Sequence, residues 1–179
     1  MRDWNVVARV GDRAYQEAHR AVGELAPVAW TDYFNGLVMR VPEVRAFAED
    51  LLVLWEADPN LSRVLGRVTP LERLFHFQSP AELEARAKGA VTPWLETLAG
   101  TRFYVRMHRR GFKARIASPE VERLLDRWIQ ERVAEGGPSA EVDFADPDWI
   151  VDLETVAQRG WVACWGRIER ARYPFLNLD

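Results

Sequence analysis

Segments typical of strands and of helices alternate along the first 78 residues, and this order limits the possible folds more than any other feature. Runs rich in Val and aromatic residues predict strands over 4–10, 32–41 and 72–78. Apolar residues at helical spacing predict helices over 14–26 and 43–57. Strand and helix in this order are typical of a small α/β sandwich of the ferredoxin-like kind.

Two local details belong to this part of the chain. The pair Asn35-Gly36 lies inside the second expected strand and predicts a β-bulge there. Residues 61–68, LSRVLGRV, are expected to add another helical turn before the third strand.

A strong helix start, SPAE, follows the third expected strand. Ser79 can cap the helix, Pro80 suits its first position, and Glu82 completes a capping box. We therefore expect a domain boundary at Gln78-Ser79. Helical sequence continues to Leu98, with an interruption near Thr92-Pro93.

The second half repeats strand and helix with different content. Residues 102–108, RFYVRMH, alternate as a strand does: Phe103, Val105 and Met107 should face a core, and Tyr104, Arg106 and His108 the opposite side. A helix opens at Ser118, and its apolar stripe is Val121, Leu124, Leu125, Trp128 and Val133. Further strands are expected at EVDF, 149–156 and 160–168.

Composition excludes several classes of protein. The chain is 48% hydrophobic with eight Trp, so no long disordered stretch is expected. No apolar run approaches 18 residues, and the first residues lack the apolar core of a signal peptide. A single cysteine, Cys164, rules out an internal disulfide and a Cys-rich zinc cluster. We expect a soluble, cytoplasmic protein without a membrane partner.

A search for catalytic chemistry finds no GxGxxG, GxxxxGK[ST], GxSxG or HExxH motif. Cys164 has apolar neighbours and fits buried packing, and no carboxylate near His108 in sequence could orient it. Between Glu131 and Glu154 stand eight carboxylates and one Arg, which fit a solvated rim or partners for a basic strand better than acid–base catalysis. We expect no catalytic residue, no cofactor and no metal site.

Positive charge is concentrated in residues 102–115, RFYVRMHRRGFKAR. This stretch holds six of the 24 Arg and Lys and no Asp or Glu, although the whole chain has a formal net charge of −3. Phosphates require several cations in one place, and unpaired bases stack on rings or guanidinium planes. The stretch predicts either a solvated face or a contact with RNA or another polyanion.

The order and content of the second half resemble the THUMP domain. The strand FYVRMHRRGFKA, the helix start SPEVE and the segment EVDFADPDWIVDLETV carry the resemblance. The matching positions of that last segment are Val142, Asp143, Pro147, Asp148, Ile150, Leu153 and Glu154. DYFNGLVMRV, FHFQSPAE and ARYPFLNLD are similar to single-THUMP proteins related to the adaptor for tRNA cytidine acetylation.

The resemblance covers nearly the whole chain and sets the expected fold class, α/β (α+β). It implies an N-terminal ferredoxin-like domain at 1–78 and a THUMP domain at 79–179. It also implies RNA binding, most often of tRNA, beside an activity such as thiolation, methylation, pseudouridylation or acetylation. Most members carry a fused catalytic domain, whereas this sequence ends at Asp179 without one. We therefore expect a non-catalytic tRNA-binding adaptor that works with a separate tRNA-modifying enzyme.

The RNA-contacting surface that the resemblance implies falls on the basic stretch. Its residues are Arg106, Arg109, Arg110, Lys113 and Arg115, with His108 and Tyr104 as weaker candidates. Two alternatives stay open from the sequence. One is a protein-interaction module whose basic strand meets an acidic partner, and the other is a small RNA-directed enzyme using His108 with a carboxylate from 143–154.

Overall fold

The computed structural model describes residues 3–178; residues 1, 2 and 179, including the outer limits of both expected domains, lie outside the described part. The chain forms two compact units, which we describe separately. The first unit contains the chain up to Glu72 together with Arg170–Asn177, and the second contains Arg73–Glu169 with Leu178.

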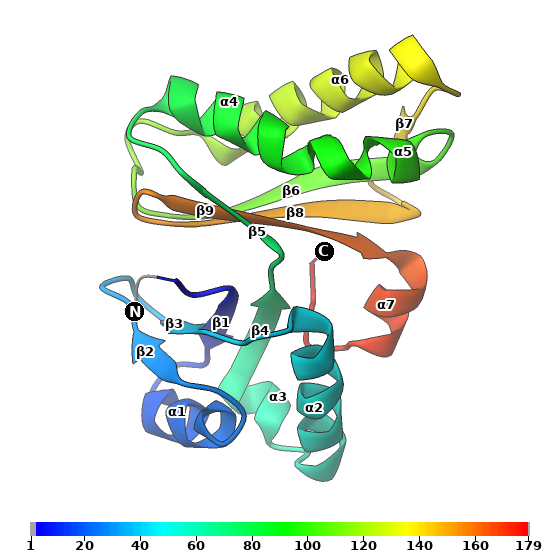
Figure 1. Cartoon of the computed structure of the whole chain (residues 1–179). Helices are drawn as coiled ribbons and strands as arrows, with labels where there is room; N and C mark the ends of the chain where they lie inside the picture. The colour runs from blue at the N-terminus through cyan, green and yellow to red at the C-terminus, as the bar shows by residue number, and fades with distance from the viewer. Residues whose placement is uncertain (1–2, 179) are drawn as a thin grey trace. The chain divides into compact units, whose positions relative to one another are not determined.

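The first unit is a four-stranded antiparallel sheet with helices on one side (Figure 1). Its strand order is β2-β3-β1-β4, with β1 between β3 and β4. This topology confirms the expected ferredoxin-like sandwich. Its elements are β1 Val6–Val10, α1 Tyr15–Gly23, β2 Val28–Trp30, β3 Gly36–Met39, α2 Val44–Ala57, α3 Leu61–Val64 and β4 Leu65–Pro70.

Three details of the first unit differ from the expectations. Strand β2 was not predicted, because three residues are too short to show a period. Asn35 and Gly36 do not form a bulge: Asn35 has φ 56° and ends the connection between the antiparallel strands β2 and β3. Residues 61–64 are helical as expected, but 65–70 form strand β4.

The second unit is a five-stranded mixed sheet of order β5-β9-β8-β6-β7. Strand β6 is parallel to β7 and β8, while β9 is antiparallel to β8 and β5. Its elements are β5 Arg73–His76, α4 Pro80–Val91, the 3₁₀ turn η1 Thr92–Trp94, α5 Leu95–Leu98, β6 Arg102–Arg110, α6 Ser118–Gly136, β7 Glu141–Val142, β8 Trp149–Val156, β9 Arg159–Gly166 and the start of α7 Arg167–Arg172.

Helices α4, α5 and α6 lie on the same face of the second sheet (Figure 1). Phe103, Val105 and Met107 point from β6 into the core beneath them, as their alternation predicts. The stripe of α6 meets the same core through Val121, Leu125, Ile129 and Val133, with Leu124 and Trp128 packed at its margin. The mixed α/β fold class predicted from the sequence is confirmed.

The helix start at SPAE forms as expected. The Ser79 hydroxyl accepts the Glu82 N–H at 3.2 Å, and the Glu82 carboxylate accepts the Gln78 N–H at 2.7 Å. The expected strand before it, however, pairs with β9 of the second sheet and not with the first sheet. The compact units accordingly divide between Glu72 and Arg73, ahead of Gln78-Ser79.

The outer edge of β6 is held by side chains rather than by a full strand. Strand β7 pairs only with Arg102 and Phe103. Beyond them, the N–H of Val105 donates to Asp126 at 2.8 Å and that of Met107 donates to Glu122 at 2.7 Å, both from α6. Burial raises the pKa of Asp126 to about 7, against the lowering effect of the Val105 hydrogen bond.

Candidate nucleic-acid interface

The alternation of β6 places Tyr104, Arg106, His108 and Arg110 on the sheet face away from the helices. Tyr104 does not offer an accessible ring there: it is only 4% exposed, and its ring centroid lies 5.2 Å from that of Phe144. The expectation that Tyr104 stands available to stack on a base is therefore wrong for this structure. Arg106 is half-buried and forms no ion pair among the described residues.

Arg110 is tied into the sheet. Its Nη1 lies 2.9 Å from Oε2 of Glu154, which is fully buried on the neighbouring strand β8. The Arg110 side chain is itself only 14% exposed. Because an ion pair in this setting is desolvated on both sides, Arg110 contributes more to the sheet than to the surface.

His108 belongs to the same buried network. It stands opposite Glu154 in the β6–β8 register, and Asp152 lies on the same face two residues earlier. One donor atom each from His108, Asp152 and Glu154 all lie within 4.8 Å of one another. The parallel pairing therefore supplies the carboxylates that are absent near His108 in sequence. Such a trio can orient an imidazole or offer ligands to a cation, with Arg110 competing for Glu154.

The turn after β6 has a defined backbone. Gly111 and Phe112 have φ 103° and 51°, and Arg109 Nη1 donates to the Gly111 carbonyl. The Phe112 ring packs against Phe77 with centroids 5.4 Å apart, so it anchors the turn. The Arg115 guanidinium lies over the same ring, 5.3 Å from its centroid.

Three cations surround one hollow beside this turn. The hollow, of about 390 Å³, is lined by Arg109, Lys113 and Arg115, by residues 114, 116 and 117, and by the first turn of α6, which adds one carboxylate, Glu120. Lys113 and Arg115 are exposed, and none of the three forms an ion pair among residues 3–178. We call residues 109–115 the basic turn. Within it, Lys113 and Arg115 are the predicted site residues that stay exposed, with half-buried Arg109 beside them. These cations and the backbone turn can receive a polyanion.

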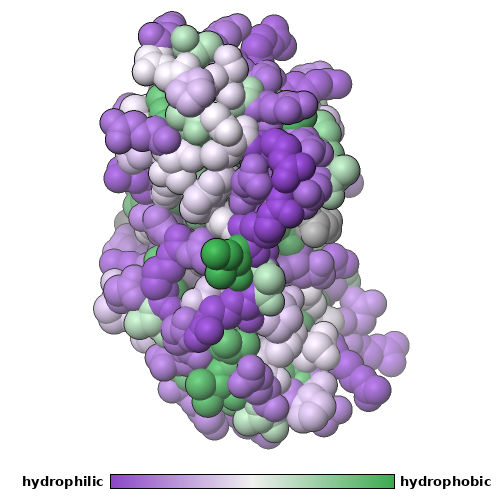
Figure 2. All heavy atoms as spheres, turned by 90° about the vertical axis from the view of Figure 1, so that its right-hand side faces the viewer, coloured by the Kyte–Doolittle hydropathy of each residue, from purple (hydrophilic) through white to green (hydrophobic). Residues whose placement is uncertain are grey.

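The opposite end of β6 is electrically neutralised. Arg102 lies within 3.5 Å of the carboxylates of Asp143, Asp146 and Asp148, and Arg167 pairs with the last two. These aspartates belong to the acidic segment 131–154, which was expected to form either a solvated rim or partners for the basic strand. Here it supplies partners for the start of that strand. Figure 2 shows the side of the molecule where α7 lies, with hydrophilic side chains dominant and hydrophobic ones in small separate groups.

Hydrogen bonds explain the charge states at this end. The pKa of Asp143 is lowered, first by the backbone N–H groups of Ala145 and Asp146. The backbone N–H of Arg102 is the main cause of the lowered pKa of Asp148. The carboxylates of Asp146 and Asp148 in turn raise the pKa values of Arg102 and Arg167. At this end the acidic motif closes a loop through these hydrogen bonds and ion pairs.

Sequence reasoning missed the contribution of the β5–β9 pair. His76 and Arg159 face each other in the antiparallel register, and the turn before Arg159 meets the end of β6 where Ala157 N–H donates to the Arg110 carbonyl at 2.8 Å. No signal in the sequence links these residues to the basic turn, because only the order of the strands brings them to one end of the sheet.

Comparison with known proteins supports the fold. No family model matches the sequence, and no curated protein sequence is significantly similar to it. Among solved structures, PH1313 from Pyrococcus horikoshii OT3 has a TM-score of 0.59 at 14% identity, over 89% of this chain and 53% of that one. TrmN from Thermus thermophilus has a TM-score of 0.56 at 18% identity, over 89% of this chain and 44% of that one. A 4-thiouridine synthetase solved with RNA and ATP has a TM-score of 0.56 at 13% identity, over 89% and 40%.

The fold of this chain is THUMP-like. At such identities the similarity concerns the fold alone, and the chain spans about half of the length of these structures or less. Among the residues described, no helix is long and apolar enough to cross a membrane.

Proposed function

We propose that this protein binds RNA, tRNA in particular, through the basic turn. The observation that carries the proposal is the gathering of Arg109, Lys113 and Arg115 around one hollow, without ion-pair partners among the described residues, in a chain of net charge −3. Unpaired cations in an acidic protein are available to neutralise phosphates, and releasing the counterions of RNA favours binding. Arg106, half-buried on β6, extends the surface toward the sheet.

We further propose that the protein is a non-catalytic, cytoplasmic adaptor without a cofactor, which presents tRNA to a separate modifying enzyme. The fold supports the link to RNA and not the adaptor role itself, because the similar structures include TrmN and a 4-thiouridine synthetase solved in complex with RNA. On this proposal the first unit is the N-terminal ferredoxin-like domain and the second the THUMP domain. The carboxylates at 143 and 148 already serve structural ion pairs, which favours a binding role.

The decisive experiment compares two triple variants in tRNA binding. Changing Arg109, Lys113 and Arg115 together to Ala should weaken tRNA binding about 100-fold at moderate salt and lower the salt slope by about 2 to 3. The matched control changes Arg86, Lys88 and Arg127, also two Arg and one Lys, on α4 and α6. Filter binding over a KCl series measures both quantities. An equal loss in the two variants would mean that net charge alone, and not the basic turn, governs binding.

A second function is favoured by one observation, the approach of His108 to Asp152 and Glu154. In this version the protein is a small RNA-directed enzyme, with His108 as the proton-transfer group that the carboxylates orient. Incubation of the purified protein with tRNA, followed by mass spectrometry of the nucleosides, tests it. A product that appears with the wild type and is lost in His108→Ala supports catalysis. No product, together with copurification of a modifying enzyme, supports the adaptor.

A further inference from the structure

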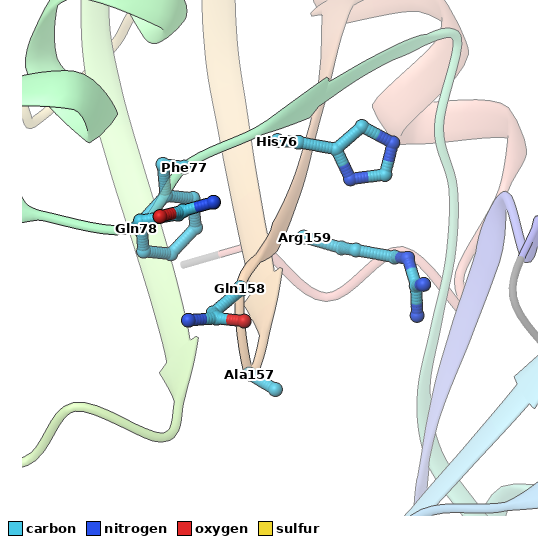
Figure 3. Close-up of a pocket in the computed structure, with 6 residues that line it drawn as sticks. All are labelled: His76, Phe77, Gln78, Ala157, Gln158 and Arg159. Carbon is cyan, nitrogen blue, oxygen red and sulfur yellow. The ribbon is translucent and has the colours of Figure 1, made fainter.

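A second hollow lies at the same end of the second sheet as the basic turn. Its volume is about 330 Å³, and its lining comes from the end of β5 and from the turn that joins β8 to β9 (Figure 3). The lining residues are His76, Phe77, Gln78, Ala157, Gln158 and Arg159. We call it the β5–β9 hollow. Phe77 and Ala157 also contact the basic turn, through the Phe112 ring and the Arg110 carbonyl. The side chains of His76, Gln78, Gln158 and Arg159 belong to neither the basic turn nor the His108 network.

Backbone pairing makes this hollow a fixed feature of the sheet. Phe77 N–H donates to the Gln158 carbonyl at 3.1 Å, directly beyond the paired residues His76 and Arg159. Ala157 turns the chain with φ 52°, and its N–H donates to the Arg110 carbonyl at the end of β6. The hollow is therefore joined through the backbone to the strand that leads into the basic turn.

The chemistry of the lining selects for an anion. One guanidinium, one imidazole and two side-chain amides line the hollow, and no carboxylate does. Figure 3 shows the side chains of His76 and Arg159 extending in the same direction from adjacent strands, whereas Phe77 points elsewhere. Phe77 is only 1% exposed, so its ring is packed away from a ligand in the hollow.

Among residues 3–178, Arg159 has a buried donor without an acceptor, as Arg109 in the basic turn also has. The Arg159 Nε is buried and donates to no group in the described part of the chain, and Arg159 forms no ion pair there. A buried donor without an acceptor is disfavoured, and a phosphate oxygen satisfies a guanidinium with good geometry.

We propose that the β5–β9 hollow binds a phosphate group of an RNA nucleotide. Arg159 and His76 contact the phosphate oxygens, and the amides of Gln78 and Gln158 donate to or accept from the attached ribose or base. This inference rests on the proposed RNA-binding function and adds a second contact to it. The RNA backbone then passes from the basic turn to the β5–β9 hollow along one end of the sheet.

Two measurements on the full chain test the inference. In the first, ¹⁵N NMR follows the Arg159 Nε and the Gln78 and Gln158 amides during titration with adenosine 5′-monophosphate, with adenosine as the uncharged control. We expect shifts with the nucleotide and none with adenosine. Absence of shifts with the nucleotide, or equal shifts with both compounds, overturns the inference.

In the second measurement, tRNA binding is compared between Arg159→Gln and the control Arg127→Gln, an exposed arginine on α6. Arg159→Gln should weaken binding about five- to tenfold and lower the salt slope by about 1, while the control stays near the wild type. If tRNA binds the wild type and Arg159→Gln equally well, the hollow is excluded while RNA binding stands. If tRNA does not bind but the nucleotide still shifts Arg159, RNA binding by this protein fails and the phosphate site stands.

Discussion

Strand β6 has an arginine at each end, Arg102 and Arg110, but the positive charge is neutralised around the first end and, in the described part of the chain, left unpaired beyond the second. At its start, Arg102 is surrounded by the carboxylates of Asp143, Asp146 and Asp148. Past its other end, Lys113 and Arg115 are exposed without an ion pair among the described residues. The difference lies in which loops the topology delivers: the β7–β8 loop brings aspartates to one end, and the β8–β9 turn brings Arg159 to the other.

This contrast divides the basic stretch of the sequence into separate roles. Arg102 closes a loop, and Arg110 compensates a buried glutamate. Lys113 and Arg115 form an exposed surface, with half-buried Arg109 beside them. A run of positive charge in a sequence is thus not one site, because each cation is available only if the fold leaves it without a carboxylate partner.

The largest expected effect is on stability and comes from Asp126, the α6 carboxylate that accepts the N–H of Val105 in the middle of β6. Burial raises the pKa of Asp126 from its ordinary value of 3.8 to about 7 in the folded chain, so folding takes up a proton between about pH 4 and 7. Its contribution to stability is therefore present at low pH and is lost as the pH rises toward 7. Asp126→Asn, which still accepts the Val105 N–H, should gain stability over the wild type by at most about 4 kcal/mol as the pH rises from 4 to 8.

Urea unfolding of both proteins at pH 4, 6 and 8 measures this gain. A difference between the two that stays constant across the series would show that folding does not raise the pKa of Asp126.

The variant Arg110→Ala tests the second of these roles, the compensation of the buried Glu154. Removing a partner of fully buried Glu154 should lower the free energy of unfolding by about 3 kcal/mol, with RNA affinity reduced mainly through unfolding. The control is Arg106→Ala, on the same face of β6, which should change stability by less than about 1 kcal/mol. Chemical denaturation compares the two. Similar stability of both variants would mean that Arg110 belongs with the open surface.

Asp146→Asn sharpens the comparison at the neutralised end and has the smallest expected effect. This carboxylate is 58% exposed and pairs with Arg102 and Arg167, which keep Asp148 as a partner. Removing one negative charge should raise tRNA affinity about twofold at low salt through the long-range potential, and not at high salt. A rise of tenfold or more would reveal that the arginines at this end bind RNA once released.

The sequence predicts the fold well where its signals are local. The capping box at Ser79, the alternation along β6 and the stripe of α6 each depend on spacing within one element. Strands β2 and β4 were missed because one has three residues and the other includes Gly66 and Pro70, so their identity comes from pairing with neighbours.

The candidate site was predictable only in part. The basic turn could be found from its composition, because its cations are close together in the sequence. The Tyr104 ring packs on Phe144, in the loop before strand β8, and strand β8 itself supplies the partner of Arg110 and the carboxylates near His108. All of these partners are about 40 to 45 residues away in the sequence. The β5–β9 hollow joins segments about 80 residues apart and leaves no trace in local composition.

The carboxylates that α6 places along the outer edge of β6 have a consequence for assembly. An incoming strand would need the N–H groups of Val105 and Met107, and Asp126 and Glu122 already occupy both. Two acidic side chains beside the backbone leave little room for an added strand, so the sheet is protected from growing at this edge into a filament or a swapped dimer.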